Sequence, residues 1–122
     1  MTDERIALVV DDNATNRLLA RTLLKKLGWQ SDEADGGAAA IERLRARRYP
    51  VILLDISMPG MSGEETCAAI RAMPEGRNIR IVAYTAHAFP EEKTRILAAG
   101  FDDMVIKPVS LQSLGVAIAG EA

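Results

Sequence analysis

The chain has 122 residues, of which 48% are apolar, so it is long enough for one domain with a buried core and too apolar for intrinsic disorder. Its 15 basic and 17 acidic residues give a formal net charge of −2, which argues against a protein built to bind the nucleic-acid backbone. The polar, acidic start does not resemble a signal peptide, no apolar run is long enough to span a bilayer, and the lone Cys67 excludes an internal disulfide. These features predict a soluble cytoplasmic protein.

Short apolar runs alternate along the chain with longer segments of helical periodicity, which is typical of a βαβ protein with a parallel sheet. The predicted strands, in chain order, are residues 6–10, 29–34, 51–54, 79–84 and 103–106. The predicted helices that alternate with them are residues 14–27, 37–47, 63–73, 90–99 and 110–119. Right-handed crossovers between such strands give a three-layer α/β sandwich. The chain ends directly after the last helix, so we expect residues 1–122 to form one domain.

The first strand is apolar at every position, which predicts a central place in the sheet with helices on both faces. The second strand alternates with polar residues and is expected at an edge. The first two helices are expected to bury one stripe each, formed by Leu19, Leu23 and Leu27 and by Ala40, Ile41 and Leu44. The basic cluster Arg43, Arg45, Arg47 and Arg48 has no interleaved aromatic residue, and we interpret it as the solvated end of a helix.

Local signals fix several helix ends. Gly28 and Gly100 are expected to stop the first and fourth helices. Ser62 and Glu65 have the spacing of a capping box at the start of the third helix, and Ser110 is expected to cap the last one. Cys67 falls at an inward helical position, so we interpret it as a core residue rather than a redox site.

Every candidate reactive side chain directly follows a predicted strand. Asp11 and Asp12 follow the first strand, Asp55 follows the third, Thr85 the fourth and Lys107 the fifth. The carboxyl ends of parallel strands share one edge of the sheet, where ligands bind. Three carboxylates, a hydroxyl and an ammonium at that edge suit the binding of a divalent metal and the transfer of a phosphoryl group.

The three aspartates predict a metal site. At a separation of 4 Å, each carboxylate pair would repel by on the order of 4 kcal/mol at an effective dielectric constant of 20. A hard divalent cation removes this repulsion, and Mg²⁺ prefers oxygen ligands. The alternative is that Asp11 and Asp12 are helix caps and that Asp55 is an ordinary loop residue.

Four segments together resemble the receiver domain of two-component response regulators along nearly the whole chain. They are Leu8-Val9-Val10-Asp11-Asp12-Asn13, Leu54-Asp55-Ile56-Ser57-Met58-Pro59-Gly60-Met61-Ser62-Gly63, Ala83-Tyr84-Thr85-Ala86 and Ile106-Lys107-Pro108. The resemblance implies a flavodoxin-like fold with the strand order 2-1-3-4-5 and five helices. It also implies that Asp12 and Asp55 ligate Mg²⁺ directly, that Asp11 acts through water, and that the backbone carbonyl of Ser57 adds an oxygen.

By the same resemblance, Asp55 is the phosphoacceptor, because a carboxylate can attack phosphorus to give an acyl phosphate. Lys107 would pair with Asp55 or with the phosphoryl oxygens, and Thr85 would donate its hydroxyl to a phosphoryl oxygen and act as the switch. The family places a cis peptide bond between Lys107 and Pro108. An ordinary surface lysine and an ordinary strand-end threonine are the alternatives for Lys107 and Thr85.

Three further positions near the site carry weaker expectations. Receivers usually couple the switch to an aromatic residue three positions before the lysine, where this chain has Met104, so gating by an aromatic ring is in question. Ser57 and His87 each lie two residues after a site residue, where receivers tune the lifetime of the phosphoryl group. The hypothesis for His87 is an effect on the attacking water or on the approach of a partner, with an exposed histidine of no role as the alternative.

The sequence therefore predicts a phosphoacceptor switch in a two-component phosphorelay that uses Mg²⁺. A histidine kinase or a histidine phosphotransfer domain would supply the phosphoryl group. The modified form would shift a conformational equilibrium at the face of the fourth helix, fifth strand and fifth helix. We expect no turnover of an external substrate, no contact with nucleic acid and no membrane contact, while dimerisation on phosphorylation stays open.

Two other classes of function stay open at this point. One is a Mg²⁺-dependent phosphohydrolase, although haloacid-dehalogenase-like enzymes carry a second aspartate where this chain has Ser57, and no cap domain is present to enclose a substrate. The other is an interaction module that keeps the fold without the chemistry. The sequence also leaves two contexts open: a stand-alone regulator, or a receiver from a hybrid sensor kinase, which Asp12-Asn13-Ala14-Thr15-Asn16-Arg17 resembles.

Overall fold

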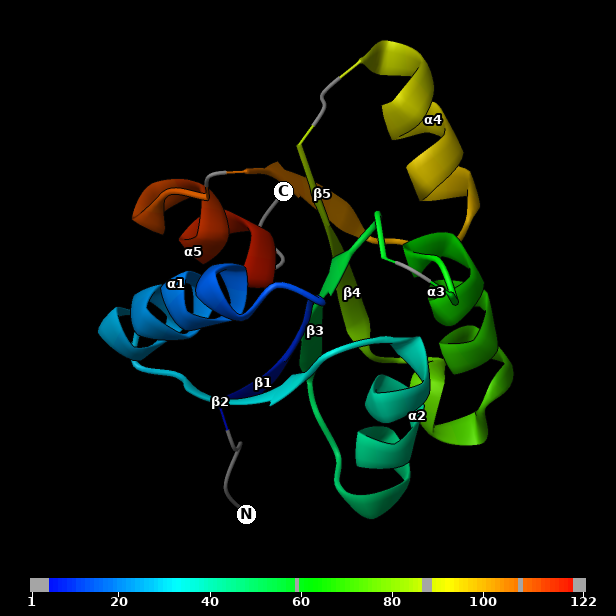
Figure 1. Ribbon diagram of the computed structural model, residues 1–122, viewed down its shortest axis with the longest axis horizontal. Coiled ribbons are helices and arrows are strands. Elements are labelled where there is room, and N and C mark those ends of the chain that lie inside the picture. Colours follow the sequence, from blue (N-terminus) through cyan, green and yellow to red (C-terminus); the bar gives the residue numbers. More distant parts are fainter. Residues whose placement is uncertain (1–4, 59, 87–88, 108, 120–122) are drawn as a thin grey trace.

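The computed structural model describes residues 5–58, 60–86, 89–107 and 109–119. The described strands form one parallel sheet in the order β2-β1-β3-β4-β5 (Figure 1). The strands are β1 Ile6–Val10, β2 Gln30–Ala34, β3 Val51–Asp55, β4 Arg80–Thr85 and β5 Asp103–Ile106. The flavodoxin-like strand order implied by the resemblance is therefore confirmed.

Four α-helices connect these strands and a fifth follows β5, and together they cover both faces of the sheet. They are α1 Ala14–Lys26, α2 Gly37–Ala46, α3 Gly63–Ala72, α4 Pro90–Ala98 and α5 Leu111–Ala119, and a short 3₁₀ helix, η1 Pro74–Gly76, follows α3. Helices α1 and α5 lie on one face, and α2, α3 and α4 lie on the other (Figure 1). The result is the expected three-layer sandwich, and none of the described helices has the length and apolarity to cross a bilayer.

Two cores arise because successive residues of a strand point to opposite faces of the sheet. In β1, Ile6, Leu8 and Val10 belong to the core under α2, α3 and α4, whereas Ala7 and Val9 belong to the core under α1 and α5. All five residues of β1 are buried, which confirms its central place. In β2 only Ala34 is buried, which confirms that it is an edge strand.

The helix ends agree with the local signals. Gly28 and Gly100 adopt positive φ angles of 87° and 113°, which fit a glycine directly after a helix. The capping box of α3 is complete, because the amide of Glu65 donates to Ser62 Oγ at 3.1 Å and the amide of Ser62 donates to Glu65 Oε1 at 2.9 Å. Ser110 Oγ accepts from the amide of Ser113 at 3.1 Å and caps α5 as predicted.

The predicted stripe of α1 is confirmed for Leu23 and Leu27, which pack against the core, and wrong for Leu19. Ala20 and Leu24 are the fully buried positions, whereas Leu19 is 38% exposed. Leu23 and Leu27 are only partly buried beside the core. The face of α1 that is turned towards the sheet is therefore centred on Ala20 and Leu24, and Leu19 lies beside this face. In α2, Ala40 and Leu44 are buried as predicted, while Ile41 is half-buried.

Two side-chain predictions away from the site are confirmed. The four arginines of the basic cluster are all exposed at and after the end of α2, at residues 43, 45, 47 and 48. Cys67 is fully buried in α3, and burial raises the pKa of its thiol to about 11, which suits an inert core residue.

Candidate metal and phosphoryl-transfer site

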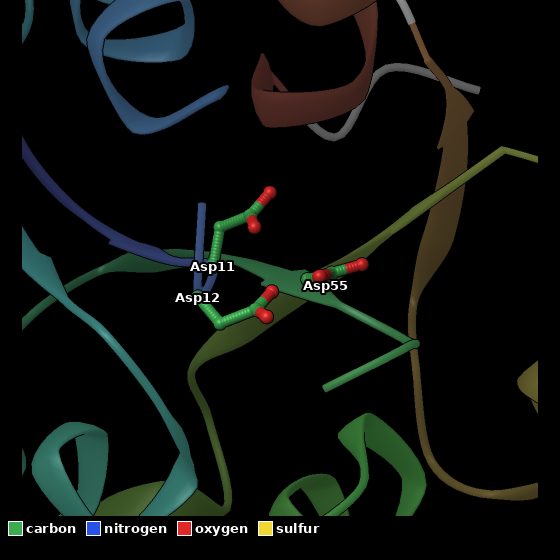
Figure 2. A group of neighbouring side chains, drawn as sticks. All are labelled: Asp11, Asp12 and Asp55. Atoms are coloured by element: carbon green, nitrogen blue, oxygen red, sulfur yellow. The ribbon is translucent and has the colours of Figure 1, made fainter. Parts of the chain in front are cut away.

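The three aspartates meet at the carboxyl edge of the sheet, as the sequence predicted. One ligand oxygen from each of Asp11, Asp12 and Asp55 lies within 4.8 Å of the others. Figure 2 shows these side chains at the neighbouring ends of β1 and β3. Asp11 and Asp55 are buried, at 0% and 2% exposure, and Asp12 is exposed. The site therefore offers a metal ion two buried carboxylates and one exposed carboxylate.

The strand period explains why the two buried carboxylates face each other. Asp11 continues the alternation of Ala7 and Val9, and Asp55 continues that of Val51 and Leu53, so both side chains emerge on the face covered by α1 and α5. Parallel pairing of Val10 with Leu54 then brings the two strand ends to the same level.

Backbone contacts fix the two loops that carry the carboxylates. The amide of Asn13 donates to Asp11 Oδ1 at 2.9 Å, and the amide of Ser57 donates to Asp55 Oδ1 at 3.2 Å. Asn13 also caps α1 by accepting from the amide of Asn16 at 3.0 Å. On the other side, α3 approaches β3 so closely that a Cβ on Gly63 would collide with the carbonyl oxygen of Asp55. These contacts hold both acids before any ligand arrives.

Lys107 reaches the site from the end of β5. Its Nζ lies 3.0 Å from Asp55 Oδ1 and 3.4 Å from Asp11 Oδ2, so one ammonium bridges the two buried carboxylates. The backbone amide of Lys107 donates to the carbonyl of Thr85 at 2.7 Å, and this bond ties the ends of β4 and β5 together. The predicted convergence of Lys107 with the acids is confirmed. Thr85 is buried at 6% exposure, and the role of its hydroxyl stays a prediction.

Burial dominates the electrostatics of Asp55. Desolvation raises its pKa above the usual range, the charge of Asp11 adds to that effect, and the hydrogen bond from Lys107 opposes it. Asp11 Oδ2 is buried without a hydrogen-bond partner, although the ammonium of Lys107 forms an ion pair with it. A buried carboxylate oxygen left without a hydrogen bond, beside two further carboxylates, fits a hard divalent cation that takes oxygen ligands.

Two predicted positions fall outside the residues that the structure describes: His87 and Pro108. The hypothesis for His87 and the expected cis bond before Pro108 therefore stay predictions. Ser57 is described and exposed, two residues after Asp55. Met104 is half-buried and packs against the core under α2, α3 and α4, on the opposite face of the sheet from Asp55.

Sequence reasoning missed an arginine that supports the aspartate loop. Arg17 Nη1 donates to the backbone carbonyl of Asp11 at 2.7 Å, and Arg17 Nε donates to Glu33 Oε1 at 2.6 Å. Arg21 Nη1 binds the other oxygen of Glu33 at 2.7 Å. The hydrogen bond from Arg17 is the main cause that lowers the pKa of Glu33. The sequence did not indicate this contact of Arg17, because its carboxylate partner lies 16 residues further on.

A second missed residue is Tyr84, which is buried at 1% exposure. The ammonium of Lys107 lies 4.7 Å from the centre of its ring. Burial, with the nearby charges of Asp11 and Asp55, raises the pKa of Tyr84 to about 12. The ring is therefore neutral at physiological pH and presents its face to the ammonium.

Five parallel strands in the order 2-1-3-4-5, with an acidic trio and a lysine at their carboxyl edge, define a flavodoxin-like domain of the receiver class. The family model for the response regulator receiver domain matches residues 7–119, and the chain belongs to this family. It is thus a signalling domain of two-component systems, homologous to the phosphoacceptor domains of hybrid kinases and response regulators.

Sensor proteins and response regulators are both among the relatives that are similar to the chain. Sensor protein GacS of Pseudomonas syringae pv. syringae is 42% identical over 110 residues, which cover 88% of this chain and 12% of that protein. Two-component response regulator ORR41 of Oryza sativa subsp. japonica is 39% identical over 116 residues, which cover 92% of this chain and 90% of that protein. The chain therefore spans about an eighth of the sensor proteins that it matches and most of the plant regulator.

A solved structure gives the same fold. The receiver domain of a sensor histidine kinase from Pseudomonas aeruginosa, with a magnesium ion coordinated in its active-site cleft, has a TM-score of 0.86 at 29% identity. The match covers 95% of this chain and 95% of that one.

Proposed function

We propose that Asp55 accepts a phosphoryl group and that the domain is a Mg²⁺-dependent relay switch. The observation that carries the proposal is the meeting of three carboxylates within 4.8 Å, two of them bridged by the ammonium of Lys107. Asp55 is the acceptor because it is the buried carboxylate nearest to the ammonium, at 3.0 Å. We also propose that residues 1–122 act as one receiver domain and that it works in the cytoplasm.

The transfer uses this chain's residues in defined roles. An oxygen of Asp55 attacks the phosphorus of a phosphohistidine, a P–O bond forms, the P–N bond breaks, and the imidazole leaves and takes a proton. Lys107 stays beside the new acyl phosphate and pairs with its oxygens, while the Thr85 hydroxyl donates to another oxygen. Asp11, Asp12, Asp55 and the backbone carbonyl of Ser57 would hold Mg²⁺, which neutralises charge on the transferring group.

The donor in this proposal is a histidine kinase or a histidine phosphotransfer domain. Receiver relatives that belong to sensor kinases support it, since such receivers exchange phosphoryl groups within a relay. The domain would modify itself and lose the phosphoryl group slowly, without turning over an external substrate. Relatives of both kinds, sensor kinases and a response regulator, match the chain.

The output face in this proposal is formed by α4, β5 and α5. Large apolar side chains are exposed there: Leu97, Ile106, Leu111 and Val116, at 41–54% exposure. Lys107 directly follows β5 and its amide is bonded to the end of β4, so a change at Thr85 and Lys107 reaches this face through the backbone. Phosphorylation would shift the conformational equilibrium of this face.

The test is incubation with a small phosphodonor such as acetyl phosphate, with Mg²⁺ or with EDTA, followed by intact-mass analysis. We expect the wild type to gain one phosphoryl group only with Mg²⁺, and Asp55→Asn to gain none. Asp35→Asn is the matched control, because Asp35 is an exposed aspartate directly after β2. Labelling that persists in Asp55→Asn would move the assignment to another residue, and labelling lost in Asp35→Asn would show that the assay reports net charge alone.

A second measurement separates the switch from a phosphohydrolase. Steady-state release of phosphate from a small phosphomonoester should be absent for the wild type, because the residue two positions after Asp55 is Ser57 rather than an acid. Sustained turnover that disappears in Asp55→Asn would make the protein an enzyme that acts on external substrates.

A further inference from the structure

An aromatic ring lies beneath the ammonium that serves the site. Lys107 Nζ is 4.7 Å from the centre of the Tyr84 ring, within the range at which a cation is attracted to an aromatic face. Tyr84 is 1% exposed, so water does not compete for that face. The Lys107 side chain is 21% exposed, and its flexible stem has an open route to solvent.

The strand register explains how the ring comes to lie there. Tyr84 pairs with Asp55 across β3 and β4 and with Val105 across β4 and β5. Its side chain belongs to the core under α1 and α5, as does that of Val105. Lys107 is two residues beyond Val105 and returns to the same face. Ring, ammonium and acceptor carboxylate therefore share one face of three adjacent strands.

We propose that Tyr84 is a positioning residue that holds the Lys107 ammonium against Asp55 and Asp11. The ring closes the space on the core side of the ammonium and attracts its charge, so the amine stays between the two carboxylates instead of turning outwards. For its readout in phosphorylation, this inference rests on the proposed function of Asp55. Tyr84 is distinct from the aromatic switch position of the family, because Met104 at that position packs on the opposite face of the sheet.

A series of phenylalanine analogues at position 84 tests the attraction at nearly constant ring size. Tyr84→Phe keeps the ring and should phosphorylate with acetyl phosphate at the wild-type rate. Stepwise fluorination of that ring weakens its negative face and should slow phosphorylation step by step. Tyr84→Leu removes the ring and should slow it about tenfold. The fluorinated series keeps the test valid if the leucine variant folds poorly.

The matched control is Val82→Ala, because Val82 is a fully buried residue of the same strand and the same core. It should lower stability and leave the phosphorylation rate unchanged. If Val82→Ala slowed the reaction as much as Tyr84→Leu, or if the fluorinated rings matched phenylalanine, packing alone would explain the role of Tyr84 and the proposal would be overturned.

A second readout does not depend on phosphorylation. Because Lys107 Nζ lies 4.7 Å from the ring centre, the protons on the adjacent Cε should show ring-current shifts in NMR spectra of the wild type and of Tyr84→Phe. In Tyr84→Leu these shifts should vanish. Their absence in the wild type would overturn the positioning role even if Asp55 were phosphorylated, whereas their presence in a wild type that takes no label on Asp55 would disprove only the proposed function.

Discussion

Replacing Lys107 with methionine tests whether the ammonium and a divalent cation serve the same carboxylates. Methionine nearly preserves the length of the side chain and removes its charge. Asp11 and Asp55, at 0% and 2% exposure, would then face each other without a cation. Because a buried charge that loses its partner is costly, this variant should be clearly destabilised in the absence of metal.

The distances bound the size of the effect. At an effective dielectric constant of 20, the ammonium attracts Asp55 at 3.0 Å by about 5.5 kcal/mol and Asp11 at 3.4 Å by about 4.9 kcal/mol. Desolvation of the ammonium offsets much of this attraction, and Asp55 can take up a proton. We therefore expect Lys107→Met to lose about 2–4 kcal/mol of unfolding free energy at neutral pH in EDTA.

The pH dependence follows from Asp55. Its pKa is already raised in the folded state, mainly by burial, and removing Lys107 raises that pKa further. A carboxyl group with a raised folded pKa favours the folded state below its unfolded pKa and disfavours it as pH rises. The deficit of the variant should therefore be small in mildly acidic solution and should grow towards neutral pH.

Urea unfolding, with EDTA and with saturating Mg²⁺, measures the effect. Saturating Mg²⁺ should reduce the deficit to below about 1 kcal/mol, because the variant lacks the ammonium that competes with the metal and should bind it more tightly. Lys93→Met is the control, since Lys93 is an exposed lysine on α4. A variant as stable as the wild type in EDTA, or a deficit that Mg²⁺ leaves unchanged, would refute the shared-carboxylate reasoning.

Two further predictions concern groups around the site. Arg17→Ala removes the donor to the carbonyl of Asp11 and should weaken Mg²⁺ binding about tenfold in titration calorimetry. Arg21 binds the same glutamate as Arg17 without a hydrogen bond to Asp11, so Arg21→Ala should leave Mg²⁺ binding unchanged. Equal losses of affinity in the two variants would disprove a positioning role for Arg17. Burial raises the pKa values of Tyr49 and Tyr84 to about 12, so an alkaline absorbance titration of the folded protein should show both tyrosines ionising only near that pH. The free energy of unfolding should fall from about pH 10 upwards, because the tyrosines of the unfolded chain lose their protons first. Tyrosinate appearing near pH 10 in the folded protein would contradict the burial of both rings.

Much of the fold followed from short-range signals in the sequence. The apolar run Ile6–Val10 predicted a central strand because both of its faces are buried, and glycine at positions 28 and 100 marked helix ends because each adopts a positive φ angle. That Asp11 and Asp55 lie at the same edge followed from parallel pairing, since the ends of parallel strands share one edge, and the pairing of β1 with β3 brings them together there. The strand order itself came from the resemblance, because periodicity does not say which strands are neighbours.

The errors and omissions share a physical cause, which is that contacts between elements depend on close approach and register. In α1 the fully buried positions are Ala20 and Leu24, one residue beyond the predicted Leu19 and Leu23, because helical periodicity alone does not fix the rotation of a helix to within one residue. The contact of Arg17 with Glu33 joins a helix to the edge strand β2, and no local pattern marks it.

The Tyr84 contact shows how much one residue of register decides. The alternation of side chains within one strand does not say whether Tyr84 and Lys107, which come from different strands, lie on the same face of the sheet. The pairing of Tyr84 with both Asp55 and Val105 places the ring, the ammonium and the carboxylate on one face. A shift of β4 by one residue would turn the ring towards the core that holds Met104 and would leave the ammonium above a small side chain, Ala83 or Thr85. The register of β4 therefore decides both which of its residues enter each core and which side chain lies beneath the ammonium of Lys107.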